Sequence, residues 1–285
     1  MRYLFIVLLL FLGCDGDPMS PETDCAGVSG GSAVINECDL CVGGTSDVVD
    51  LCDADEDGYD DRDIQVLQDI IDINSSLEGQ NPLEIYEEGI WDDDGRLTSL
   101  TISGNQLTSL PESIGNLSSL SVLALYSNQL TSLPENIGNL SNLEELNLSG
   151  NQLISIPNSI INLTNLNVLF VSNNQIEIIP NTISNLTNLN QLSLVNNQIV
   201  TLPNSIINLT NLNHLGLGGN QLISLPNNIC NIEGIISLYS NNLCNEYYFD
   251  CISSSEWSQH GRAPQDQSNC CEGPEGQPNW TTCPE

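Results

Sequence analysis

Leucine and isoleucine recur along the middle of the chain with a period of 23 residues. The consensus of the copies reads L-x-x-L-x-L-x-x-N-x-L-x-x-L-P-x-x-I-x-x-L, with Ile or Val at some leucine positions and polar residues at most of the intervening positions. Six copies begin at Leu97, Leu120, Leu143, Leu166, Leu189 and Leu212. A seventh, degenerate copy brings Leu238, Asn241 and Leu243 two residues early. Self-similarity at a fixed period of this length predicts an array of stacked structural repeats.

The L-x-L segment of each copy predicts a short strand, because successive side chains of an extended chain point to opposite faces. One copy cannot bury its leucines alone, so neighbouring copies must stack and pair their strands into a parallel sheet. The proline then fixes a non-helical start to the second half of the copy. We therefore predict an α/β solenoid over residues 97–243, with few or no α-helices on the side opposite the sheet.

This pattern resembles the leucine-rich-repeat family, in the subclass whose second half reads L-P-x-x-I-x-x-L. The resemblance covers about half of the chain and implies a curved right-handed coil with a concave parallel β-sheet. It also implies that the repeated asparagine bonds the backbone of neighbouring coils. Triplets such as Asn162-Leu163-Thr164 match a glycosylation acceptor, but the repeat explains them without sugar, and we predict no glycans.

In this family, ligands usually contact the strand positions that flank the buried leucines. Carried over residue by residue, the candidate ligand-binding residues are Val122, Ala124, Tyr126, Glu145, Asn147, Val168, Phe170, Gln191, Ser193, His214 and Tyr239. The other flanking positions are Ser99, Thr101, Ser103, Ser149, Ser172, Val195, Gly216 and Gly218. A cluster of Val122, Tyr126, Val168 and Phe170 fits a protein or peptide partner. The alternative is that these residues are tolerated surface substitutions in a recently duplicated array.

Charge narrows the range of partners. The chain has 37 acidic residues against four arginines, no lysine, and a formal net charge of -33. Such a chain repels phosphate backbones, so we predict no nucleic-acid partner. His214 is the one histidine of the repeats, and no acidic partner stands near it at the strand positions. Without an arrangement of nucleophile and base we predict that the protein is not an enzyme and requires no cofactor.

The first residues are typical of a targeting signal. Arg2 precedes an apolar run over residues 3–12, which is too short to span a bilayer and suits a signal peptide over residues 1–13. The sequence Phe11-Leu12-Gly13-Cys14 resembles the bacterial lipobox, which implies lipidation of Cys14. The alternative is an ordinary secretory signal. We expect an exported lipoprotein, anchored to a membrane of the bacterial envelope through this N-terminal lipid.

The remaining ten of the 11 cysteines predict disulfide bonds, because exported proteins meet an oxidising environment. They divide evenly around the repeats. The disulfide candidates are Cys25, Cys38, Cys41, Cys52, Cys230, Cys244, Cys251, Cys270, Cys271 and Cys283. Cys38-x-x-Cys41 alone also fits zinc or redox chemistry, but no second metal-ligating pair accompanies it. We predict an acidic stalk over residues 14–52, a cysteine-rich cap and tail over residues 244–285, and disulfide-rich caps at both ends of the solenoid.

An acidic loop begins the segment 53–96. Its alternating carboxylates and glycine resemble calcium loops of the EF-hand, dockerin or thrombospondin-repeat kind. The candidate calcium ligands are Asp53, Asp55, Asp57, Tyr59, Asp61 and Asp63. A solvated acidic turn is the alternative. Helical spacing of Ile64, Leu67, Ile70 and Ile71 predicts a cap helix, and Ile90 and Trp91 are expected to cover the edge of the first coil.

These features together predict a non-enzymatic binding module that mediates protein recognition or adhesion outside the cell. Two alternatives stay open at this stage. One is a structural spacer in the envelope without a specific ligand, and the other is a calcium-dependent surface protein that binds glycans.

Overall fold

The structure is a computed structural model that describes residues 58–243 and two short strands before them. These strands, β1 (Val34–Ile35) and β2 (Cys41–Val42), pair antiparallel. The chain divides into two compact units, Met1–Arg62 and Asp63–Glu285. The predicted signal peptide, Cys14 and the tail over residues 244–285 lie outside the described residues.

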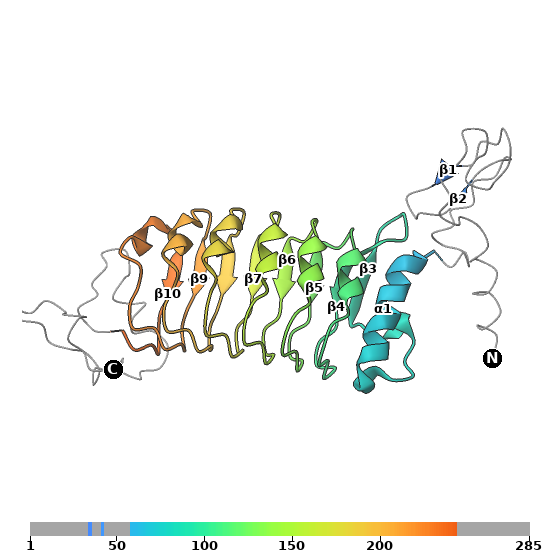
Figure 1. Cartoon of the computed structure of the whole chain (residues 1–285), viewed down its shortest axis with the longest axis horizontal. Coiled ribbons are helices and arrows are strands. Elements are labelled where there is room, and N and C mark those ends of the chain that lie inside the picture. Colours follow the sequence, from blue (N-terminus) through green and yellow to red (C-terminus); the bar gives the residue numbers. More distant parts are fainter. Residues whose placement is uncertain (1–33, 36–40, 43–57, 244–285) are drawn as a thin grey trace, which may run out of the picture. The chain divides into compact units, whose positions relative to one another are not determined.

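A single sheet runs through the repeats, with one strand from each coil (Figure 1). Its parallel strands are β4 (Leu97–Thr101), β5 (Val122–Ala124), β6 (Glu145–Asn147), β7 (Val168–Phe170), β8 (Gln191–Ser193), β9 (His214–Gly216) and β10 (Ile235–Ser237). Between β4 and β9 each residue pairs with the residue 23 positions later, as Leu123 does with Leu146. The degenerate seventh copy still supplies a strand, because Ile236 pairs with Leu215. The predicted parallel sheet is confirmed.

Short 3-10 helices form the opposite side of the coils. They are η3 (Glu112–Asn116), η4 (Glu135–Asn139), η5 (Asn158–Asn162), η6 (Asn181–Asn185), η7 (Asn204–Asn208) and η8 (Ile229–Asn231). The repeated proline caps each of the first five, and Pro157 has φ -64° and ψ 152°. The proline ring fixes φ before the turn, and the 3-10 helix of this copy ends after five residues, at Asn162. This confirms that the second half of each copy is not an α-helix.

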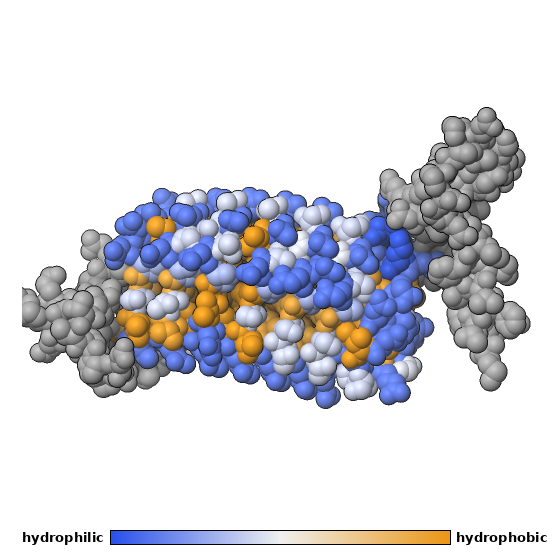
Figure 2. All heavy atoms as spheres, viewed as in Figure 1, coloured by the Kyte–Doolittle hydropathy of each residue, from blue (hydrophilic) through white to orange (hydrophobic). Residues whose placement is uncertain are grey.

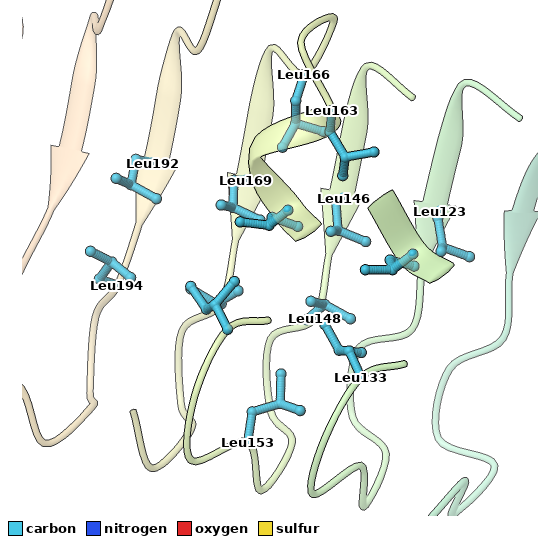
Figure 3. Close-up of a cluster of buried hydrophobic side chains, with 14 of the residues drawn as sticks. Leu123, Leu133, Leu146, Leu148, Leu153, Leu163, Leu166, Leu169, Leu192 and Leu194 are labelled. Atoms are coloured by element: carbon cyan, nitrogen blue, oxygen red, sulfur yellow. The ribbon is translucent and has the colours of Figure 1, made fainter. Parts of the chain in front are cut away.

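The repeated leucines and isoleucines form one continuous core between the sheet and the 3-10 helices. Figure 3 shows Leu123, Leu146, Leu169 and Leu192 side by side on successive strands, together with Leu163 and Leu166 from the segment that joins η5 to β7. All of these side chains are fully buried. At about 25 cal/mol per Å² of apolar surface, this stacking supplies most of the favourable free energy of folding.

The repeated asparagine bonds the backbone between coils, as the family resemblance implied. Asn151 accepts a hydrogen bond from the Leu130 amide (3.0 Å) and donates to the carbonyls of Leu125 and Leu148 (2.9 Å each). The same three contacts recur at Asn174, Asn197, Asn220 and Asn241. Each side chain satisfies three buried backbone groups that the turn after the strand leaves unpaired.

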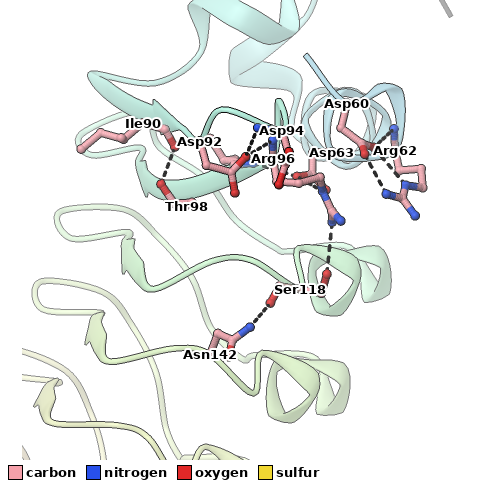
Figure 4. Close-up of polar contacts among 11 residues, drawn as sticks. Asp60, Arg62, Asp63, Ile90, Asp92, Asp94, Arg96, Thr98, Ser118 and Asn142 are labelled. Carbon is pink, nitrogen blue, oxygen red and sulfur yellow. Dashed lines mark hydrogen bonds and ion pairs between the residues drawn. The ribbon is translucent and has the colours of Figure 1, made fainter. Parts of the chain in front are cut away.

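A second asparagine ladder lies between the 3-10 helices and the strands. Asn142 donates to the carbonyl of Ser118 at 2.8 Å, as Figure 4 shows, and the contact recurs one coil later at Asn165. Asn188 and Asn211 continue it with the same length. These side chains are exposed, so this ladder makes one solvent-accessible bond per coil where the first makes three buried ones.

A cap of helix and strand covers the first coil. It consists of α1 (Asp61–Ile73), η1 (Ser75–Leu77), η2 (Pro82–Glu84) and β3 (Glu88–Trp91). The predicted helix is confirmed, since α1 buries Leu67 and Ile70 completely. The strand β3 was not predicted, and it pairs antiparallel with β4 at the sheet edge. Trp91 packs on the core, but the side chain of Ile90 is 58% exposed, so only its backbone covers the edge.

A buried ion pair joins the cap helix to the first coil (Figure 4). The Nε and Nη2 atoms of Arg96 donate to the two carboxylate oxygens of Asp63, each at 2.9 Å. The Leu97 amide donates to the same carboxylate at 2.8 Å, and Arg96 also reaches Ser118 Oγ at 3.2 Å. Asp63 is fully buried, so this bidentate contact fixes how α1 sits on β4.

Candidate binding surface

The candidate surface is the sheet face opposite the 3-10 helices, called the concave face from here on. It consists of the three positions in each coil that flank the buried leucines of β4 to β10. Gln191 is exposed, and most of the other predicted residues are half-buried by their neighbours in the sheet. Ala124 is buried, with 7% of its surface exposed, so it shapes the face more than it contacts a partner.

The strand register divides the predicted apolar cluster into two parts. Val122 pairs with Glu145, and Glu145 pairs with Val168, so a polar position separates the two valines. Phe170 lies beside Asn147 of β6 in the same way. Strands are about 4.8 Å apart, so the residues of β5 and β7 lie about 10 Å apart across β6. Tyr126 and Phe170 are therefore two separate contact points rather than one patch.

The last coils present a different surface. Glycines occupy two flanking positions around β9, and the ring of Tyr239 lies against Gly218, where any Cβ would collide with it. His214 lies between Gln191 and Ile235 in the sheet. Ile235 is 58% exposed and occupies the strand position that corresponds to His214, but the repeat pattern did not predict it. The shortened seventh copy hid it, because the period of 23 points two residues away.

One residue outside the repeats also reaches this surface. Glu87 immediately precedes β3, and its amide donates to the Thr101 carbonyl at 2.8 Å. Its carboxylate accepts a hydrogen bond of 2.6 Å from Ser103 Oγ and lies 3.5 Å from the Tyr126 hydroxyl. Sequence reasoning missed Glu87, because it lies outside the period and β3 carries no alternating pattern of apolar residues.

The predicted calcium ligands fall into three groups. Asp53, Asp55 and Asp57 lie outside the described residues, so calcium binding by the loop stays a prediction. Tyr59 is half-buried and Asp61 exposed at the start of α1. Asp63 has a structural role that the calcium interpretation did not anticipate, because both its oxygens accept hydrogen bonds from Arg96. Over the described residues, no three histidine, cysteine or acidic side chains are grouped to hold a metal ion.

The predicted disulfides are described at one position. Cys230, at the middle of η8, is disulfide-bonded. The side chains of the other candidate cysteines lie outside the described residues, so their pairing stays a prediction. In the same described part of the chain, no helix has both the length and the apolar character needed to cross a membrane.

Comparison with known proteins defines the class of this solenoid. The family model described as a leucine-rich repeat region matches residues 95–170 and 111–198. A solved leucine-rich-repeat protein of Leptospira interrogans is 36% identical, with a TM-score of 0.50, over 52% of this chain and 38% of that chain. A search of curated proteins gives no match. The array over residues 97–243 thus has the fold of a leucine-rich-repeat solenoid, and residues 95–198 match the family model itself.

Two plant receptors share the fold. The ectodomain of the membrane receptor kinase GASSHO1/SCHENGEN3 from Arabidopsis thaliana, solved with CASPARIAN STRIP INTEGRITY FACTOR 2, is 27% identical with a TM-score of 0.54. That match covers 64% of this chain and 24% of that chain. The plant peptide hormone receptor RGFR1, solved with RGF2, is 32% identical with a TM-score of 0.51, over 55% and 29% of the two chains. This chain therefore spans well under half the length of all three structures.

Proposed function

We propose that this protein is an exported, membrane-anchored module whose concave face binds a protein or peptide. One observation carries the proposal. Over the six full copies the apolar ladder positions remain Leu, Ile or Val and the asparagine and proline positions keep their identity. The flanking strand positions, in contrast, change from Val122 to Glu145, Val168, Gln191 and His214. A scaffold that is held constant beneath a variable, accessible sheet is what a recognition surface requires.

The comparisons with known proteins support a binding function. Two of the similar solenoids belong to receptors that were solved in complex with a second molecule: one is the ectodomain of a membrane receptor kinase and the other is a peptide hormone receptor. The absence of lysine and arginine over residues 97–243 argues against polyanionic ligands. Export and membrane attachment rest on the apolar run over residues 3–12 and on Cys14.

The test compares two double variants of the mature full-length chain. Tyr126→Ala with Phe170→Ala removes two of the aromatic side chains of the concave face. Ile154→Ala with Ile178→Ala is the control, because these side chains are 63% and 72% exposed and lie outside the sheet. Cross-linking to extracellular extract, followed by mass spectrometry, identifies a partner, and its affinity for each variant is then measured.

We expect the concave variant to lose affinity by about tenfold or more, because buried aromatic side chains carry much of the free energy of such interfaces. The control variant should retain the affinity of the unmodified chain. Equal affinity of the two variants for the identified partner would place recognition elsewhere, and the concave face would then serve only as a spacer.

A further inference from the structure

We propose that Glu87 and Tyr126 together form a subsite for the side chain of an arginine or lysine in the bound partner. The inference rests on the proposed function, since it names the chemistry of a ligand on the same concave face. It adds a residue from the N-terminal cap to the binding surface and assigns one charge to the partner.

The position of Glu87 is fixed from two sides. Its amide is held by the Thr101 carbonyl at 2.8 Å, so the backbone lies against the end of β4. Its carboxylate is held by the Ser103 hydroxyl at 2.6 Å and lies 3.5 Å from the Tyr126 hydroxyl. Ser103 is only 9% exposed, whereas Glu87 itself is exposed. The carboxylate is therefore held in place at the rim of the sheet and open to solvent.

No cation of the described residues neutralises this carboxylate. Arg62 binds Asp60, and Arg96 binds Asp63 and Ser118. These are the two basic residues in the described part of the chain, and residues 97–243 contain no other. Two hydroxyl donors occupy part of the hydrogen-bonding capacity of a carboxylate, which offers about four lone-pair directions. The remaining directions are available to a donor that arrives with a ligand.

An arginine or lysine side chain matches what this site offers. Its N–H groups can donate to the carboxylate in a charge-assisted hydrogen bond, and its cation is attracted to the face of an aromatic ring such as Tyr126. A net charge of -33 also raises the encounter rate of a positively charged partner. An acidic group is repelled by the carboxylate, and a neutral donor gains the hydrogen bond without the ion pair or the attraction to the ring. The site therefore favours a basic side chain over every other class.

The experiment titrates the mature full-length chain, labelled with nitrogen-15, with N-acetyl-arginine N-methylamide and follows amide chemical shifts. N-acetyl-citrulline N-methylamide is the matched neutral probe. Glu87→Gln is the test variant, and it keeps an oxygen that accepts from Ser103. Glu177→Gln is the matched control, because it removes one negative charge from an exposed loop residue outside the sheet. Both variants carry the same net charge.

The arginine probe should shift the amides of Glu87, Ser103 and Tyr126, and the citrulline probe should not. Glu87→Gln should weaken the arginine probe about three- to fivefold, as expected for an exposed charge pair, and Glu177→Gln should not weaken it. Equal weakening by the two variants overturns the inference, because it shows that only net charge attracts the probe. An arginine probe that shifts none of these three amides at tens of millimolar also overturns it.

The partner identified by cross-linking separates this inference from the proposed function. If its affinity depends on Tyr126 and Phe170 but is unchanged by Glu87→Gln, the basic subsite is wrong and the binding function stands. If its affinity depends on none of these residues, the proposed function fails.

Discussion

At the scale of single residues, the repeated asparagine makes hydrogen bonds to backbone groups that no apolar side chain could make. After each strand the backbone turns inward, and its polar groups lose their partners in the sheet. One amide group supplies an acceptor and two donors in the required directions, as at Asn151. Aspartate would lack the donors and leucine would lack both. The position is therefore constant in every coil for a structural reason and says nothing about the ligand.

The two asparagine ladders predict very different costs for the same substitution. Asn151→Ala leaves three buried backbone groups without partners, and we expect it to lower the free energy of unfolding by about 3 kcal/mol or more. Asn142→Ala, at the end of the preceding copy, removes one exposed hydrogen bond and should cost about 1 kcal/mol or less. Urea denaturation of the two variants measures both values. Similar losses would show that the inner ladder is not the main support of the turn.

The residue before each asparagine of the buried ladder must adopt a particular backbone conformation. Its φ is positive in every coil, with Gly150 at 70°, Asn173 at 55° and Ser127 at 57°. Glycine adopts this conformation without strain, and asparagine tolerates it better than most residues. The pattern S-G-N, S-N-N and Y-S-N at the ends of the strands follows from this requirement, so these residues also serve the scaffold.

At the scale of elements, the N-terminal cap covers the sheet edge that the first coil would otherwise leave open. A parallel array leaves the backbone groups and leucines of its first coil uncovered, which invites pairing with another chain. Here β3 runs antiparallel to β4 and satisfies that edge, while α1 covers the leucines beneath it. The Asp63–Arg96 pair ties the two parts of this cap to the first coil.

This pair gives a prediction for the cap. Asp63→Asn removes the negative charge and leaves the guanidinium of Arg96 partly buried without its partner, since its side chain is 16% exposed. We expect a loss of about 3 kcal/mol in the free energy of unfolding. The loss should be the same with and without calcium, because the oxygens of Asp63 already accept hydrogen bonds from protein groups.

Asp72→Asn is the control, since it is the same change on an exposed face of the same helix. Asp72 accepts one hydrogen bond from Gln68, a contact worth about 0.5 kcal/mol or less. Thermal or urea unfolding in calcium and in chelator measures both variants. A loss at Asp63 that appears only in calcium would restore that residue to the metal site.

The elements also show where sequence reasoning succeeds and where it ends. A residue such as Leu146 is predictable because its period of 23 fixes both its strand and its buried direction. Glu88–Trp91 has no repeat and little alternation, so β3 becomes visible only through its pairing with β4. Glu87 and Ile235 were missed for related reasons, because a cap residue and a shortened copy both leave the period. The row of strand positions that flank the buried leucines was predictable, but the division of its apolar residues by β6 follows from the register.

At the scale of the whole molecule, charge is distributed unevenly along the chain. Between Leu97 and Ile229 there are only five acidic residues, although the chain carries 37. The remaining acid lies in the flanking segments, and two of the four arginines bind neighbouring aspartates. The repeats therefore contribute little to the net charge of the molecule, and most of its electrostatic field comes from the flanking segments.

The proposed attachment of this molecule to a membrane gives the last prediction. From the run over residues 3–12 and the cysteine that follows it, we propose that acyl chains on Cys14, rather than a protein segment, hold the chain to the bilayer. Cys14→Ala removes the acceptor sulfur and should release the protein into the aqueous phase of a detergent partition, with loss of metabolically incorporated fatty acid. Cys52→Ala, which removes another cysteine from the same half of the chain, is the control and should remain in the detergent phase.

The two outcomes follow from one physical difference. An acyl chain contributes about 0.8 kcal/mol for each CH₂ group that it buries, so its removal abolishes membrane binding unless the protein binds the bilayer in another way. Basic residues could supply such binding, but a chain with a net charge of -33 is repelled by anionic lipid. If the Cys14→Ala variant stays in the detergent phase, lipidation at that residue is wrong, and the binding surface must be carried by an ordinary secreted protein or by a different anchor.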